Sequence, residues 1–158
     1  MTITPKFEMD NVAAVLADAN ARFGLNSANV VATGFSAGGM LTWQLACERS
    51  DLIRAAIPMS GTFWTPVPPS CNSPAVSLIH IHGDADRTIP ISVARRFAEA
   101  SVDAGASCEL VEYEGQGHGF FNHPAFRKNN DPAIYADTME RTVVFLRDMG
   151  LLDLPADD

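Results

Sequence analysis

The sequence predicts an α/β fold: a three-layer sandwich with a mostly parallel sheet of about four strands and helices on both faces. Short apolar runs alternate along the 158-residue chain with longer segments whose apolar residues recur every three or four positions. Strands that alternate with helices pair in parallel, because each helix carries the chain back to the start of the next strand. With 47% hydrophobic residues and no internal repeat, residues 1–158 are expected to form a single domain.

The predicted strands are short apolar runs bounded by turns or polar residues, at 30–33, 55–59, 76–81 and 108–113. The predicted helices lie at 10–23, 37–49, 92–104 and 132–149. The first helix is expected to bury the stripe Val12, Val15, Leu16, Ala19 and Phe23, and the last helix the stripe Tyr135, Met139, Thr142 and Leu146. Only residues 62–73, which include three prolines, fit neither pattern; we expect an ordered loop over the end of the sheet.

Charge and hydropathy exclude several kinds of partner. The formal net charge is -8 and no basic cluster is present, so neither nucleic acid nor an anionic membrane is an expected partner. No apolar run approaches the roughly 20 residues that a spanning helix needs. The first residues lack the basic start and apolar stretch of a secretory signal, so the compartment is unknown and cytoplasmic by default.

The three cysteines, Cys47, Cys71 and Cys108, match neither a zinc motif nor a Cys-x-x-Cys redox motif. We expect buried or free thiols, because cysteine often serves as a small core residue. A disulfide between Cys47 and Cys71 is the alternative, which spacing does not decide. No metal site and no cofactor are predicted.

A nucleophile is predicted where the strand at 30–33 turns into the helix at 37–49. Gly34-Phe35-Ser36-Ala37-Gly38 is a Gly-x-Ser-x-Gly motif in the strand–turn–helix context that this motif requires. The sharp turn forces the serine into an unfavourable backbone conformation, and the glycines two residues on either side let neighbouring segments come close. Ser36 is the predicted nucleophile, and the backbone N–H of Ala37 the predicted donor to an oxyanion.

A base and an acid are predicted just past the ends of later strands. His118, in a Gly-His-Gly segment, would remove the serine proton, and Asp86 would hold the imidazole tautomer. Asp84 is a weaker rival for the acid, because it is better placed to serve the turn itself. Among the remaining histidines, His80 and His82 fall within or at the end of a strand and are expected to be structural, and His123 is a weak rival for the base.

Three segments together resemble the α/β-hydrolase superfamily, and within it the esterases related to polyhydroxybutyrate depolymerases, feruloyl esterases and acetylxylan esterases: residues 34–40, 78–90 and 117–122. The last segment also resembles dienelactone hydrolases and prolyl-oligopeptidase-like enzymes. The resemblance covers nearly the whole chain from about residue 10 onward. It implies hydrolysis of a carboxylic ester through an acyl-serine intermediate, without metal or organic cofactor.

The sequence departs from that superfamily before Ser36. Such enzymes usually place several strands before the nucleophile strand, and a glycine-rich loop after one of them supplies a second oxyanion donor. Only 35 residues precede Ser36, and they contain no such loop. We therefore expect a truncated α/β-hydrolase fold whose nucleophile strand lies at an exposed sheet edge, either a truncated hydrolase or a minimal one that forms a homo-oligomer through that edge.

The sequence says less about the substrate than about the catalytic residues. Trp64, Phe120 and Phe121 fall in loops at the predicted active end, where they either line an apolar pocket or pack the loops together. The leading hypothesis is an esterase for short acyl or aromatic esters, more active as the imidazole of His118 becomes neutral. The alternatives are a prolyl-oligopeptidase-like peptidase and a catalytically weak fragment that lacks a complete oxyanion hole.

Overall fold

In the computed structural model, which describes residues 5–62, 71, 76–103 and 105–153, the strands form one parallel sheet. Its order follows the chain: β1 (Val31–Phe35), β2 (Ala55–Met59), β3 (Ser77–Gly83) and β4 (Cys108–Tyr113). The predicted α/β class and parallel pairing are confirmed. Because the strands are parallel, their carboxyl ends meet at one edge, where sheets of this kind build their sites.

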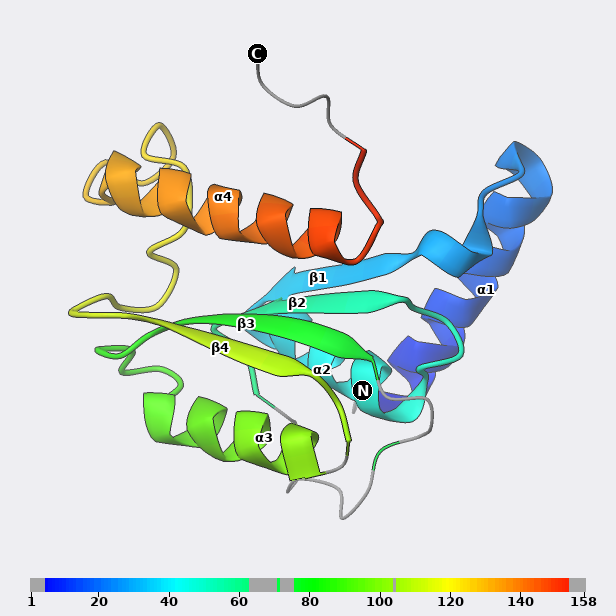
Figure 1. Ribbon diagram of the computed structural model, residues 1–158, viewed down its shortest axis with the longest axis horizontal. Helices are drawn as coiled ribbons and strands as arrows, with labels where there is room; N and C mark the ends of the chain where they lie inside the picture. Colours follow the sequence, from blue (N-terminus) through cyan, green and yellow to red (C-terminus); the bar gives the residue numbers. More distant parts are fainter. Residues whose placement is uncertain (1–4, 63–70, 72–75, 104, 154–158) are drawn as a thin grey trace.

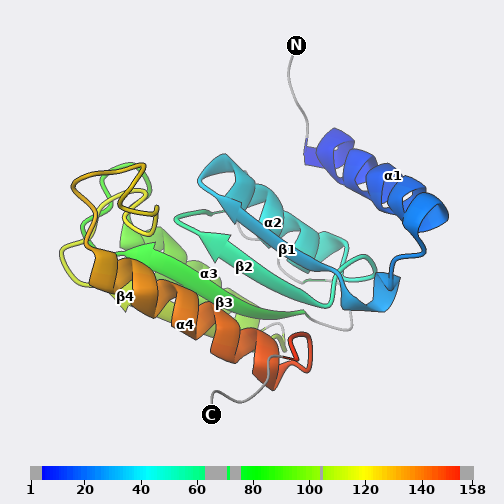
Figure 2. The same cartoon turned by 90° about the horizontal axis from the view of Figure 1, so that it is seen from above.

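Helices cover both faces of the sheet, as predicted. Figure 1 shows α4 (Pro132–Asp148) across one face, and α2 (Ala37–Glu48) and α3 (Ile91–Asp103) on the opposite face. The remaining long helix, α1 (Pro5–Phe23), packs against α2 beside the sheet (Figure 2) and is followed by a short 3-10 turn, η1 (Ser27–Asn29). The predicted helices are therefore all present, and their ends differ from the predicted ends by a few residues.

Two apolar cores result from the alternation of side chains along the central strands. Leu78 of β3 packs with Trp43 and Phe97 on the α2 and α3 side. The neighbouring Ile79 packs with Ile81 on the α4 side. Residues adjacent in a strand point to opposite faces, so one strand supplies both cores.

The predicted inner faces of the first and last helices are partly wrong. In α4, Thr138 is buried, whereas Met139 is 44% exposed, because the face toward the sheet runs through Ile134 and Thr138 to Phe145 and Leu146. In α1, Met9 and Val12 reach the core, but the predicted inward residues Val15 and Phe23 are exposed. Figure 2 shows the reason: α1 lies beside the sheet, where it packs against α2.

The prediction of three thiols is wrong for two of the cysteines, which form a disulfide. Cys47 and Cys71 are bonded, with their Cα atoms 4.5 Å apart, which joins the last turn of α2 to the segment between β2 and β3. The reading of these two residues as free thiols is therefore wrong, and the alternative holds. Cys108 is free, as expected, and burial raises its pKa to about 12.

The nucleophile strand lies at an edge of the described sheet, as predicted. The backbone of β1 pairs with β2 on one side, and Thr33 donates its hydroxyl proton to the carbonyl of Ile57 across that pair. Self-association through the other side of β1 stays a prediction. Most of the predicted loop at 62–73 lies outside the described residues. No described helix has the length and apolar character needed to cross a bilayer.

Candidate active site

Ser36 occupies a strained turn between β1 and α2, as its motif predicts. Its φ is 55° and its ψ is -114°, a region that L-residues rarely adopt and that is typical of functional sites. The turn is fixed from both sides, because the N–H of Ser36 donates to the carbonyl of Met59 at 3.0 Å and its carbonyl accepts from Met40 at 2.9 Å. Ala37 is the first residue of α2, so its N–H is among those that a helix leaves unpaired at its N-terminus.

The glycines around Ser36 play different roles from those that the motif suggests. A Cβ atom on Gly34 would overlap the backbone of Gly38, whereas a Cβ on Gly38 would meet nothing within 4 Å. Gly39, which lies outside the motif, is buried, and a Cβ there would lie 2.9 Å from the carbonyl oxygen of Met59. Close packing therefore requires glycine at 34 and 39. The Gly-Gly pair at 38 and 39 was the sequence signal for the second of these positions.

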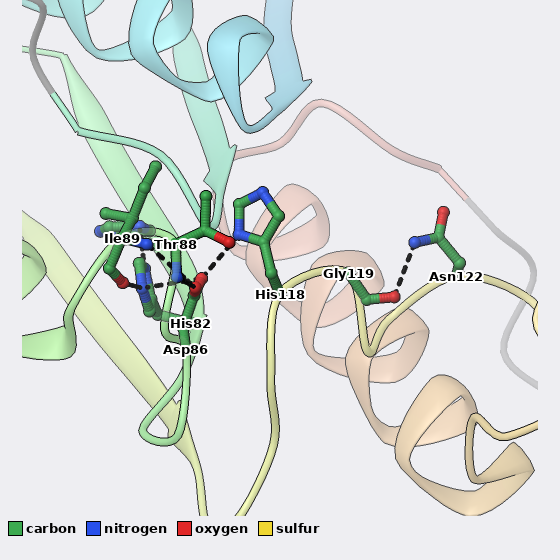
Figure 3. A network of polar contacts seen from close by, with 8 residues as sticks. His82, Asp86, Thr88, Ile89, His118, Gly119 and Asn122 are labelled. Atoms are coloured by element: carbon green, nitrogen blue, oxygen red, sulfur yellow. Dashed lines mark hydrogen bonds and ion pairs between the residues drawn. The ribbon is translucent and has the colours of Figure 1, made fainter.

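Asp86 and His118, which are 32 positions apart, form a hydrogen-bonded pair. Asp86 follows β3, His118 follows β4, and Nδ1 of the imidazole lies 2.7 Å from Oδ2 of the carboxylate (Figure 3). The side chain of Asp86 is fully buried, and that of His118 is 21% exposed. The carboxylate accepts the Nδ1 proton, which leaves Nε2 of the neutral ring as a proton acceptor.

The other carboxylate oxygen of Asp86 is held by the backbone. The N–H groups of Thr88 and Ile89 donate to Oδ1 at 2.8 and 3.0 Å. Burial by itself would raise the pKa of Asp86, but the hydrogen bonds from His118, Ile89 and Thr88 outweigh it and hold that pKa below the ordinary value. The carboxylate is therefore ionised at neutral pH and fixed in one orientation.

Asp84 ties the two loops together and does not contact the imidazole. Its carboxylate accepts from the N–H of Gly115 at 2.7 Å, and its own N–H donates to the carbonyl of Tyr113. Close by, the N–H of Ala85 donates to the carbonyl of Gln116 at 3.0 Å. The structure thus pairs Asp86 with His118 and gives Asp84 the turn-supporting place that the sequence suggested for it.

The imidazole of His118 is brought to the end of β1 by a ring contact. Its centroid lies 4.7 Å from that of Phe35, the residue before Ser36. The three predicted residues therefore lie at one end of the sheet. Among the described contacts, the hydroxyl of Ser36 makes no hydrogen bond to His118, and catalytic hydrogen bonds without substrate are often long.

The predicted pocket residues are placed differently. Phe120 and Phe121 are only 4% and 8% exposed and belong to the core under α4, which is the packing alternative that the sequence left open. Trp64 lies outside the described residues. The ring of His123 packs against those of Phe126 and Tyr135.

Sequence reasoning missed the contacts of His80 and His82 beside the proposed acid. His80 and His82, which were expected to be structural, are fully buried, and Nε2 of His80 lies 3.2 Å from Nδ1 of His82. His82 in turn lies beside Asp86, with Nε2 3.5 Å from Oδ2 (Figure 3). The two-residue spacing of the histidines on β3 was the signal, because it places both rings on one face. In the part of the chain that the structure describes, no group of three His, Cys, Asp or Glu side chains is arranged to hold a metal ion.

Known proteins resemble this chain in sequence and in structure. Residues 3–150 match the model of the dienelactone hydrolase family. A protein of Methylorubrum extorquens named "putative carboxymethylenebutenolidase" is 26% identical over 152 residues, which are 90% of this chain and 51% of that protein. The chain therefore spans about half the length of the curated relative that it matches.

Solved structures of one esterase share the fold. Esterase Est2 of Thermogutta terrifontis with propionate bound has a TM-score of 0.73 at 26% identity, over 88% of this chain and 62% of that chain. The same enzyme phosphonylated by cyclosarin has a TM-score of 0.69 at 28% identity, over 84% and 59%. The resemblance to esterases of the α/β-hydrolase superfamily is thereby confirmed. By the family match, which spans nearly the whole chain, this chain belongs to the dienelactone hydrolase family.

Proposed function

We propose that the chain carries the nucleophile, base and acid of a serine hydrolase that cleaves carboxylic esters through an acyl-serine intermediate. The observation that carries this proposal is the 2.7 Å contact between Asp86 and His118, held beside the strained turn at Ser36. A serine hydroxyl is a weak nucleophile until an oriented imidazole takes its proton. The family and the esterase neighbours support the same reaction class.

The proposed reaction assigns one role to each of the groups described above. Nε2 of His118 takes the proton of the Ser36 hydroxyl while Oγ attacks the ester carbonyl carbon. The carbonyl oxygen becomes an oxyanion, which accepts from the N–H of Ala37. The imidazolium, stabilised by Asp86, then gives its proton to the leaving alcohol. Water attacks the acyl-serine with the same proton transfers and releases the acid and free Ser36.

We further propose that short acyl esters are substrates. The Thermogutta esterase has been captured with propionate and with butyrate, which are short carboxylates, and phosphorylated by paraoxon. Those ligands belong to that enzyme, and they support a small acyl site for this chain. Reaction with an organophosphate would also fit an activated serine at position 36.

Two measurements test the proposal with one variant. Hydrolysis of p-nitrophenyl acetate and butyrate is expected from the wild type and not from Ser36→Ala. Paraoxon is expected to add one diethyl phosphoryl group to the Ser36 peptide of the wild type, detected by mass spectrometry, and none to that peptide of the variant. Equal hydrolysis rates for the two proteins, together with an unmodified Ser36 peptide, would end the catalytic claim and leave a hydrolase fragment without activity.

A further inference from the structure

Two buried histidines lie behind the proposed acid, and the reaction described above does not use them. His80 and His82 are fully buried on the α2 and α3 side of β3, where the ring of His80 meets that of Trp43. Nε2 of His80 lies 3.2 Å from Nδ1 of His82, and Nε2 of His82 lies 2.9 Å from the carbonyl oxygen of Ile89. Buried polar groups are almost always hydrogen-bonded, so these contacts indicate which ring nitrogens donate and which accept.

The contacts assign the tautomer of each ring. A carbonyl oxygen accepts only, so Nε2 of His82 must carry a proton and donate it to Ile89. Nδ1 of a neutral His82 is then an acceptor, and Nε2 of His80 must donate to it. Burial lowers the pKa of both histidines, in the case of His80 to about 3, which keeps the pair neutral. The chain of donors therefore runs in one direction, from His80 through His82 to Ile89.

Ile89 connects this chain to the acid. Its carbonyl accepts from His82, and its N–H donates to Oδ1 of Asp86 at 3.0 Å. Nε2 of His82 also lies 3.5 Å from Oδ2 of Asp86, the oxygen that binds His118. Figure 3 shows Asp86 between His82 and His118. The turn from Asp86 to Ile89 is thus held by the carboxylate at its start and by His82 at its end.

We propose that His82, oriented by His80, is a positioning residue that fixes the turn at 86–89 and so aims the carboxylate of Asp86 at His118. The proposal rests on the proposed function, because it assigns His82 a role in the same reaction. Because His82 is neutral, it donates a hydrogen bond but places no positive charge beside the carboxylate of Asp86. That charge remains available to stabilise the imidazolium of His118.

The wild type alone provides the first test. Nitrogen-15 NMR of the histidine side chains at neutral pH is expected to show both His80 and His82 protonated on Nε2. A proton on Nδ1 of His82 would reverse the chain of donors and overturn the proposal. This measurement needs neither a variant nor turnover.

The second test compares His82→Phe, which removes the donor, with His82→Gln, whose side-chain amide can still donate to the carbonyl of Ile89. A small misplacement of a catalytic group can cost about 10²-fold in rate. We expect His82→Phe to lower kcat for p-nitrophenyl acetate by roughly 10- to 100-fold with KM within about twofold, and His82→Gln to restore most of kcat. Ile79→Val, on the opposite face of the same strand, is the matched control and should retain wild-type kcat.

A third readout separates this proposal from the proposed function. The proton on Nδ1 of His118, hydrogen-bonded to Asp86, should give a downfield NMR signal that weakens in His82→Phe and not in Ile79→Val. This signal reports positioning even if the wild type and Ser36→Ala hydrolyse esters at equal rates. A folded His82→Phe variant with wild-type signal and wild-type kcat would refute the positioning role.

Discussion

The ring of His118 lies against the ring of Phe35, with centroids 4.7 Å apart. Phe35 ends β1 and precedes Ser36, so this contact joins the base loop after β4 to the nucleophile turn after β1 across the whole sheet. Phe35 also meets Phe121 of the core edge-on, at 5.1 Å. One aromatic side chain thus connects the predicted base, the nucleophile turn and the core under α4.

Removal of this ring should affect both activity and stability. We expect Phe35→Ala to lower kcat by about 10-fold, because His118 loses the surface that orients it. The free energy of unfolding should fall by about 2 kcal/mol, below the usual cost for a fully buried Phe because Phe35 is only partly buried. Ester hydrolysis and urea unfolding measure the two effects. Phe35→Leu should keep more of both, and an unchanged kcat in Phe35→Ala would show that the contact does not orient the base.

The two aspartates that compete for the acid role can be separated by matched substitutions. Asp86→Asn replaces a charged acceptor of the Nδ1 proton by an amide, which destabilises both the required tautomer and the imidazolium. We expect kcat to fall by about 10³- to 10⁴-fold. Asp84→Asn retains an oxygen that can accept from Gly115, so kcat should stay within a few-fold of wild type. The reverse order of these two effects would transfer the acid role to Asp84.

The glycines of the nucleophile turn should respond oppositely to the same substitution. A methyl group at Gly34 would overlap the backbone of Gly38, so Gly34→Ala should lower the free energy of unfolding by about 2 kcal/mol or more. Gly38 lies in α2, and a Cβ added there would meet nothing within 4 Å, so Gly38→Ala should raise that free energy by about 0.5–1 kcal/mol. Urea unfolding of both variants is the measurement. Equal destabilisation would mean that both positions are crowded.

Stability should fall in mild acid because of His80. Its folded-state pKa is lowered to about 3 by burial and by the neighbouring His82, whereas an unfolded histidine titrates near 6.5. Between these values the unfolded chain binds one more proton, so the contribution of His80 is complete above about pH 6.5 and decreases as the pH falls toward 3. The expected slope from this residue is about 1.4 kcal/mol per pH unit.

Urea unfolding at pH 7, 6 and 5 measures this slope. The lowered pKa values of His82 and of carboxylates such as Asp86 act in the same direction, so the wild-type slope exceeds the contribution of His80 alone. His80→Phe should reduce the slope by about one proton, whatever its stability at pH 7. Parallel pH profiles for the wild type and His80→Phe would show that His80 titrates normally in the folded state.

The disulfide should stabilise the chain measurably. Cys47 and Cys71 are 24 positions apart, and closing a loop of this size removes entropy from the unfolded chain worth about 3.5 kcal/mol. Dithiothreitol should therefore lower the melting temperature of the wild type and leave that of the Cys47→Ala/Cys71→Ala variant unchanged. A wild type insensitive to dithiothreitol would contradict the contribution assigned to the disulfide.

Cys108 should resist iodoacetamide at pH 8 in the native protein, because burial raises its pKa to about 12.

Local pattern sufficed for the elements, for the strained turn at Ser36 and for the pairing of Asp86 with His118. The strands at 55–59 and 108–113 have the predicted bounds, because short apolar runs between turns leave few other conformations. The strained turn at Ser36 follows from five consecutive residues. The pairing of Asp86 with His118 was predicted from their places after two strands, since the ends of parallel strands meet.

The sequence by itself determined where each helix and strand lies and which side chains stand at the carboxyl ends of the strands. Only the tertiary structure decided which surfaces meet: that Thr138 and not Met139 faces the sheet, that Cys47 reaches Cys71, and that His82 contacts the carbonyl of Ile89. Periodicity is a property of a single segment and can be read from it. A contact between two segments depends on how both are placed against the sheet, and no single segment carries that information.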